Sequence, residues 1–162
     1  MRYKITFKNQ VRNWYDFVFQ GSIFAPFILY AYFKSGTNGL FIFYTFLSIQ
    51  FAFTFYLHLV YYIKNMGEEY CLEKDKIIKI NNDTKTVYFT KDILKIVICK
   101  SANKDSWGIP FTTFETFRIA RVYLNDGTNF IMTNLLEYDL EKPLRILQGV
   151  RFERRKGFSF FI

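Results

Sequence analysis

The sequence predicts an α+β membrane protein, in which a hairpin of two apolar helices precedes a β-rich domain that ends in a helix. Three observations lead to this prediction. Residues 17–63 carry a single charged side chain, Lys34, whereas residues 64–162 carry 17 basic and 13 acidic side chains. Beyond residue 68 the apolar residues fall into short runs separated by turn-forming residues, which is typical of short strands. Leu140, Leu144 and Leu147 then form a stripe at helical spacing.

The first 16 residues mix aromatic and basic side chains. Alternation at the start favours a short strand, and from about Lys8 an amphipathic pattern favours a helix lying on a membrane surface. Trp14 and Tyr15 come just before the first apolar run, where aromatic belts meet lipid headgroups. We therefore expect residues 1–16 to form an interfacial segment with Trp14 and Tyr15 in contact with lipid.

Two apolar runs, residues 17–33 and 40–63, are candidate membrane spans within a hairpin of residues 17–63. As helices they are about 25 and 36 Å long, against a hydrocarbon core of about 30 Å. The alternative is a pair of buried core helices, which two such long runs make the weaker interpretation. Residues 34–39 are too few for anything but a turn.

The charges beside these runs predict an orientation. Cytoplasmic flanks of membrane spans are enriched in Lys and Arg, and the turn between the two runs carries only Lys34. The basic residues outside the hairpin are Arg2, Lys4, Lys8 and Arg12 before it and Lys64, Lys74, Lys76 and Lys79 after it. Both termini are therefore expected on the cytoplasmic side.

The remainder of the chain has the pattern of a small β domain, residues 64–149, followed by a tail, residues 150–162. Asn125, Asp126 and Gly127 form a strong hairpin signal, and Gly149 is a plausible end for a helix over residues 138–148. Cys71 and Cys99 lack metal-site or redox spacing and are expected to be free thiols. The expected strands are 70–73, 76–80, 85–90, 94–99, 118–124 and 128–133.

A series of short strands followed by one C-terminal helix is the order of elements found in a pleckstrin-homology (PH)-like barrel or sandwich. The chain resembles membrane-anchored PH-like proteins of bacteria, of the type found in Bacteroidetes and similar in layout to YcxB-like proteins. That resemblance implies two membrane helices, a cytoplasmic PH-like domain, a place in the bacterial inner membrane and no established activity. A PH barrel has seven strands, and the seventh is expected from residues 2–7, 109–113 or the tail. The segments that carry the resemblance are 64–70 (KNMGEEY), 75–78 (DKII), 120–122 (ARV) with 126–127 (DG), 131–136 (IMTNLL) and 147–156 (LQGVRFERRK).

The sequence contains no catalytic or cofactor-binding signature. Its one histidine, His58, lies in the second apolar run, and no nucleophile elbow, phosphate loop or metal-ligand spacing is present. We therefore expect a protein that is not an enzyme, with no cofactor, metal, nucleic-acid or small-molecule ligand. A proton-transfer site around His58 is the enzymatic alternative.

Two basic clusters are candidate contacts with lipid headgroups. Lys74, Lys76 and Lys79 surround a turn and could clamp a phosphate, although lysines also protect sheet edges from aggregation. In the tail a basic cluster precedes aromatic residues, which suits an anionic membrane surface. A solvated tail or a strand packed on the domain is the alternative there. The expected lipid contacts of the tail are Arg151, Arg154, Arg155, Lys156 and Phe158.

Polar and small side chains within the apolar runs are candidates for helix association. Asp16 and His58 should lie at similar depth, so Asp16, with Gln20, could hydrogen-bond His58. The alternative leaves Asp16 in water. The other candidate residues could pack the two helices of this hairpin against each other or bind another membrane protein. The other candidates are Gly21 and Ala25 on the first helix and Gln50 and Thr54, in line with His58, on the second.

Taken together, these features predict a multi-pass inner-membrane protein with both termini in the cytoplasm. Its β domain is expected to bind another membrane or membrane-associated protein, as an interaction module or accessory subunit. The alternative is a sensor of anionic lipid headgroups, for which the net charge of +8 is suited.

Overall fold

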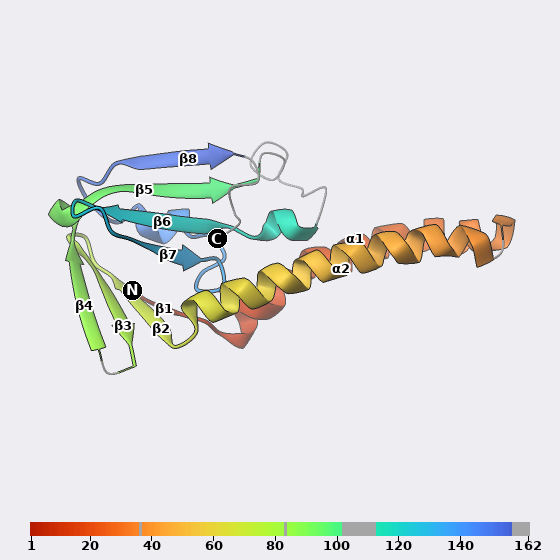
Figure 1. The fold of residues 1–162 in the computed structure, drawn as a ribbon, viewed down its shortest axis with the longest axis horizontal. Coiled ribbons are helices and arrows are strands. Elements are labelled where there is room, and N and C mark those ends of the chain that lie inside the picture. The colour runs from red at the N-terminus through yellow and green to blue at the C-terminus, as the bar shows by residue number, and fades with distance from the viewer. Residues whose placement is uncertain (36, 83, 102–112, 157–162) are drawn as a thin grey trace.

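In the computed structural model, a long helical hairpin extends from two β-sheets that lie at its base (Figure 1). The structure describes residues 1–35, 37–82, 84–101 and 113–156. A short strand, β1 (Arg2–Lys4), is followed by helices α1 (Phe7–Ser35) and α2 (Thr37–Asn65). Both helices are long and apolar enough to cross a membrane, over Phe7–Lys34 and Phe43–Asn65, a test of length and composition alone.

The first sheet has the strand order β1-β2-β3-β4 and is antiparallel throughout. Its strands β2 (Glu68–Leu72), β3 (Lys76–Asn81) and β4 (Thr84–Phe89) follow α2 directly. Gly67, with φ of +75°, lies between α2 and β2; this backbone conformation favours glycine and ends helices. The chain therefore passes from the hairpin into the sheet without a linker.

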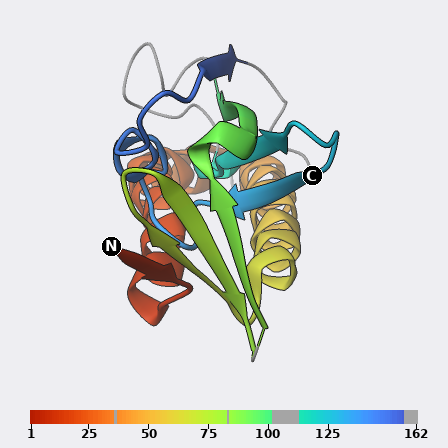
Figure 2. The same cartoon turned by 90° about the vertical axis from the view of Figure 1, so that its left-hand side faces the viewer.

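The second sheet has the strand order β7-β6-β5-β8. Strands β5 (Ile93–Lys100), β6 (Ile119–Leu124) and β7 (Asn129–Thr133) are antiparallel, whereas β8 (Phe152–Lys156) pairs with β5 in parallel. Short 3₁₀ helices, η1 (Thr90–Asp92) and η2 (Thr113–Thr116), precede β5 and β6. Figure 2 views the molecule from the end that carries the sheets; α1 and α2 lie next to each other behind β3 and β4.

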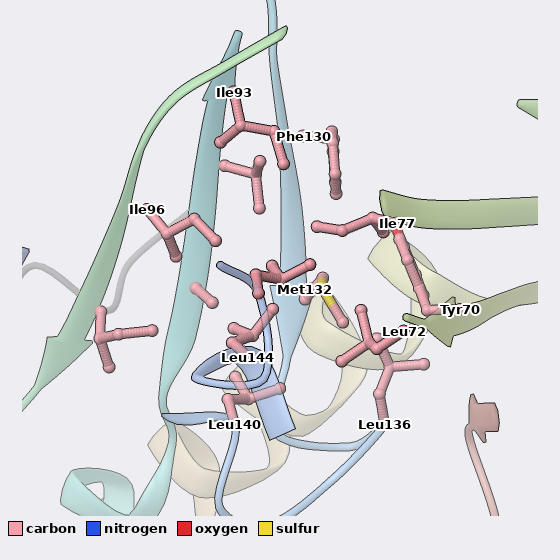
Figure 3. Close-up of a cluster of buried hydrophobic side chains, with 14 of the residues drawn as sticks. Tyr70, Leu72, Ile77, Ile93, Ile96, Phe130, Met132, Leu136, Leu140 and Leu144 are labelled. Carbon is pink, nitrogen blue, oxygen red and sulfur yellow. The ribbon is translucent and has the colours of Figure 1, made fainter. Parts of the chain in front are cut away.

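The inner faces of the two sheets enclose the main hydrophobic core (Figure 3). Tyr70, Ile77, Ile96 and Met132 are almost wholly buried there. Leu140 and Leu144, from the segment around α4 (Glu141–Leu144), close one end of this core. Successive side chains of a strand point to opposite faces of its sheet, and the side chains of this core come from the inner faces of the two sheets.

The six strands and the turn expected from apolar periodicity are present, with bounds that differ by one or two residues. Asn125, Asp126 and Gly127 do connect β6 to β7, with Gly127 at φ +85°. Two further strands come from β1 and β8, which answers the question of the seventh strand. Cys71 and Cys99 are free thiols, as expected.

Two expected elements differ from the structure. The expected helix over residues 138–148 is only four residues long, α4, because the N–H groups of Ile146 and Leu147 bond three residues back and the N–H of Gln148 donates to the Lys74 carbonyl at 2.9 Å. The expected short strand and the helix from about Lys8 are present as β1 and α1, but α1 continues through the expected first span, 17–33, without the expected boundary. The β domain therefore includes residues from both ends of the chain, beyond the expected 64–149.

Candidate functional site

The most extensively built site is the junction between the hairpin and the second sheet. On α2, Leu57 and Tyr61 are buried in a second hydrophobic cluster with Val97 and Ile119. Tyr61 meets Phe117 edge to face, with ring centroids 5.1 Å apart. Such an aromatic pair adds about 0.5–1.5 kcal/mol to the burial of its area. The base of the hairpin is therefore part of the core of the domain.

Asn65, the last residue of α2, joins the helix to the edge of β7. Its Oδ1 accepts the backbone N–H of Thr133 at 2.8 Å, and its Nδ2 donates to the Ile131 carbonyl at 2.9 Å. The same Nδ2 donates to Glu68 at 2.7 Å. The side-chain amide of Asn65 is buried, and it both accepts a hydrogen bond from the edge strand and donates one to it. The backbone of a neighbouring strand would form the same pair of bonds.

A second amide network attaches α1 to the turn after β7. Asn134, fully buried, donates from Nδ2 to Oδ1 of Asn13 at 2.6 Å and to the Thr116 carbonyl at 3.1 Å. Asn13 donates to the Asn9 carbonyl, and Asn9 donates to the Leu136 carbonyl at 2.8 Å. Because buried amides that lose a partner are costly, this network holds α1 in one position against the domain.

Glu141 is the centre of a separate charge cluster at the edge near β8. It accepts hydrogen bonds from Lys100 at 2.6 Å, from Arg145 at 2.6 Å and from Arg154 at 2.5 Å, and its side chain is buried. Burial alone would raise the pKa of Glu141, but the hydrogen bonds from Arg154, Lys100 and Arg145 outweigh it and lower the pKa to about 2. This carboxylate ties α4 to β5 and β8 and leaves the cluster with a net positive charge.

The three lysines expected to form a headgroup loop do not converge. Lys76 pairs with Glu73 at 3.1 Å and Lys79 with Glu68 at 2.5 Å. Residues 76 and 79 are separated by an odd number of positions in β3, so they face opposite sides of the sheet. Lys74 lies in the turn, exposed, where its carbonyl accepts the N–H of Gln148.

Three basic residues of the tail, Arg154, Arg155 and Lys156, belong to the edge strand β8, and Arg151 directly precedes it. Arg154 is held by Glu141, and Arg151 pairs with Glu153 at 3.1 Å. Arg155 and Lys156 are exposed at the end of the strand, which points the way the hairpin leaves the domain (Figure 1). Phe158 lies outside the described residues.

The residues expected to associate helices differ in their surroundings. Gln50 and Thr54 are buried within this chain, which fits a role inside the molecule. A Cβ built on Gly21 would have no heavy atom of another part of the protein within 4 Å, and Ala25 is exposed. This pair of small residues therefore does not bring the described parts of α1 and α2 close together.

The expected pairing of Asp16 with His58 stays a prediction, because the side chains of Asp16 and Gln20 lie outside the described part of the structure. Trp14 packs against His58 instead, with ring centroids 5.6 Å apart. Trp14 is half-buried and Tyr15 is exposed.

Sequence reasoning missed the residues that build the junction. Asn13, Tyr61, Asn65 and Asn134 were given no role, and neither was Glu141. Two signals pointed to them: Asn9 and Asn13 are one turn apart on α1, and Asn65 is an amide at the end of an otherwise apolar helix. Neither signal reveals the partner strand, which comes from residues more than sixty positions away.

The described residues include no group of three or more His, Cys, Asp or Glu side chains placed to hold a metal ion. An open pocket of about 420 Å³ lies where β1 and β2 meet the ends of the helices. Its charged groups are all paired: Arg2 and Lys4 with Glu69, and Glu68 with Lys79 of β3, which lies outside the pocket lining. The pocket therefore resembles a polar seam of the fold more than a ligand site.

Comparison with known proteins gives one match. A family model described as a PH domain matches residues 2–142, which include β1, the hairpin and both sheets up to α4. The chain belongs to this PH domain family. No curated protein and no solved structure matches it. PH domains commonly act as modules that bind lipids or proteins.

Proposed function

We propose that this chain is a non-enzymatic interaction module of the bacterial inner membrane, whose PH-like domain binds a membrane-associated protein on the cytoplasmic side. The hairpin spans the membrane in this proposal, with both termini in the cytoplasm. The membrane-anchored PH-like proteins that the sequence resembles have the same layout. No catalytic group enters the proposal.

The observation that carries the proposal is the junction. Leu57, Tyr61 and Asn65 lie on the same helix as the apolar span yet belong to the core and edge of the second sheet. A domain attached in this way keeps one orientation relative to its anchor, unlike a domain on a flexible linker. A fixed orientation favours a module that presents one surface to a partner in or near the membrane.

Strand β4 supports a protein as the partner. It is the outer strand of the first sheet, so one row of its backbone groups has no neighbouring strand among the residues that the structure describes. Val87 and Phe89 are exposed on it, and edge strands with apolar side chains accept an added strand from a partner. By contrast, β8 at the edge of the second sheet carries mostly basic side chains, which disfavour strand addition.

The lipid-sensing alternative is supported by Arg155 and Lys156, which are exposed where β8 ends. Each basic residue near an anionic surface contributes about 1 kcal/mol. Two such residues, with the neighbouring positive cluster around Glu141, suit a contact with headgroups. This alternative places the binding surface on β8 and not on β4.

A copurification experiment separates the two functions. The full chain would be purified in mild detergent from native membranes, as wild type, as Val87→Asp with Phe89→Asp, and as Leu94→Asp. Leu94 is an exposed apolar control outside β4. A stoichiometric protein that is lost only with the β4 variant supports the proposal with β4 as the binding surface. A protein that the β4 variant retains excludes β4 as that surface, and the absence of any copurifying protein overturns the proposal. Enrichment of anionic lipid without a protein, abolished by Arg155→Glu with Lys156→Glu, supports the lipid sensor.

A further inference from the structure

At the base of the hairpin, each helix has two different faces. On α2, Leu57 and Tyr61 are buried against the second sheet and Asn65 bonds to β7, whereas the opposite stripe is apolar and exposed. On α1, Asn13 is buried, and again the opposite stripe is apolar and exposed. We call the two exposed stripes the outer face of the base; it consists of Phe7, Val11, Tyr15 and Val18 on α1 and Phe55, Leu59, Ile63 and Met66 at the end of α2.

The outer face continues the exposed surface of the candidate spans without interruption by a charged residue. In each helix its members are spaced by three or four residues, so they form one stripe along the axis. The same stripe includes Ala52 and Ser48 on α2 and Ser22 on α1, farther along the hairpin. A water-exposed helix of this length would be expected to carry a charged face, and the outer face carries none.

The length of the hairpin gives a second, independent reason. The part of α2 before Gln50, the first of its described side chains that is buried, is residues 37–49 and is about 20 Å long at 1.5 Å per residue. A hydrocarbon core is about 30 Å thick. If the hairpin spans a bilayer, the core must therefore extend at least one turn into the base. There the domain covers one side of the helices, so only the outer face is available to lipid.

Basic side chains accompany the outer face. Lys8 is exposed on α1 beside the stripe, and Lys64 is exposed at the end of α2. Arg12, also exposed on α1, places its guanidinium 4.0 Å from the centre of the Tyr138 ring of the domain and is not counted here. Between residues 7 and 66 the sequence has one acidic residue, Asp16. Long basic side chains beside an apolar stripe reach to anionic headgroups while their stems stay in the apolar layer.

From these features we propose that the outer face lies in the interfacial layer of the anionic cytoplasmic leaflet. The hairpin is then tilted in the bilayer. The PH-like domain packs on the face of the base opposite the outer face and lies close to the membrane surface. This inference rests on the proposed function, because it requires that the hairpin span the membrane. Tilting is how a hydrophobic segment longer than the bilayer fits into it. The consequence is that the edge of β4 is held at a fixed height and angle above the leaflet.

A second copy of the chain or a partner helix could also cover an apolar face. Lipid is the better occupant for two reasons. The stripe is continuous with surfaces that already face lipid in a spanning hairpin, and its rim has the charge complementary to anionic headgroups. A helix partner would instead be expected to meet small side chains, and the members of the outer face are large.

Spin-label accessibility on the full chain in nanodiscs tests the inference. Single cysteines would be placed at Leu59 and Ile63 in a background with Cys71→Ser and Cys99→Ala. Phe27→Cys reports whether the hairpin is inserted, and Leu94→Cys reports a water-exposed site on the domain. All four positions are exposed in the structure. The discs would contain phosphatidylethanolamine and phosphatidylglycerol, with oxygen as the apolar relaxation agent and a water-soluble nickel chelate as the polar one.

The ratio of oxygen to nickel accessibility should be several-fold higher at positions 59 and 63 than at position 94. A ratio at 59 and 63 equal to that at 94, with a high ratio at 27, overturns the inference and leaves the proposed function standing. A low ratio at 27 overturns both. Exclusion of both agents at 59 and 63, with dipolar broadening between labels, shows that a second copy covers the outer face. Lys8→Gln with Lys64→Gln should lower the ratio at position 63.

Discussion

Asn65 and Thr133 are 68 positions apart in the chain, and the side-chain Oδ1 of the first accepts the backbone N–H of the second at 2.8 Å. Through this bond, a residue at the end of α2 provides the hydrogen-bond partner for a backbone N–H group on the edge strand β7. Because the same amide donates to the Ile131 carbonyl, the bonding resembles that of a one-residue strand. The end of α2 and the edge of β7 are thereby joined directly through one side chain.

Replacing Asn65 by Ala should destabilise the fold by about 2–4 kcal/mol, because it leaves buried backbone groups of β7 without partners. The measurement is the thermal unfolding of the full chain in mild detergent. Asn129→Ala is the matched control, since Asn129 is an exposed residue of β7. Equal melting temperatures for the two variants would mean that water replaces the Asn65 amide without cost.

Gly127→Val should destabilise the domain by about 1 kcal/mol or more, because the φ of +85° at Gly127 is strained for a β-branched residue. Nothing lies within 4 Å of a Cβ built there, so crowding does not contribute. Gly127→Asn separates the causes, since Asn tolerates positive φ better than Val does. The Asn variant should melt closer to wild type, and an Asn variant as unstable as the Val variant would contradict this account.

The proposed topology predicts opposite labelling of two exposed lysines. Lys34 lies at the far end of the hairpin, and Lys142 lies in α4. Each would be replaced by Cys in a background without Cys71 and Cys99. In cells with a permeabilised outer membrane, an impermeant thiol reagent should label position 34 and spare position 142. The reverse pattern would invert the orientation and place the domain outside the cytoplasm.

Local periodicity explains why much of the fold could be predicted. The strands from β2 to β7 carry their own alternation, and the turn at Gly127 carries its own backbone preference, so neither depends on a distant partner. Strands β1 and β8 are different, because they are edge strands that form by pairing with β2 and β5. Their residues are compatible with several conformations, and only the completed sheets select one.

The same distinction applies to the candidate site. The apolar spans were predicted from composition, but the junction depends on which face of each helix meets the sheet. Tyr61 and Ile63 are both apolar positions in the same run, yet Tyr61 is buried in the domain and Ile63 is exposed. Where every position of a helix is apolar, the sequence pattern does not distinguish a face that contacts lipid from one that contacts protein.

The carboxylate of Glu141 predicts how stability depends on pH. Its pKa falls from the usual 4.5 to about 2 in the folded chain because the hydrogen bonds from three basic side chains outweigh its burial. A lowered pKa means that the unfolded chain takes up the proton first, so stability is present above pH 4.5 and is lost as the pH falls toward 2. A shift of this size corresponds to about 3 kcal/mol.

Glu141→Gln should therefore lower the melting temperature at pH 7, where the wild type has its full contribution from this group. The gap between wild type and variant should narrow between pH 4.5 and 2, because protonation removes the same charge from the wild type. Glu153→Gln is the control, since Glu153 pairs with Lys95 and Arg151 at a more exposed position and should show a smaller effect at neutral pH. A gap for Glu141→Gln that stays constant down to pH 2 would show that the charge of this carboxylate does not hold α4 to β5 and β8.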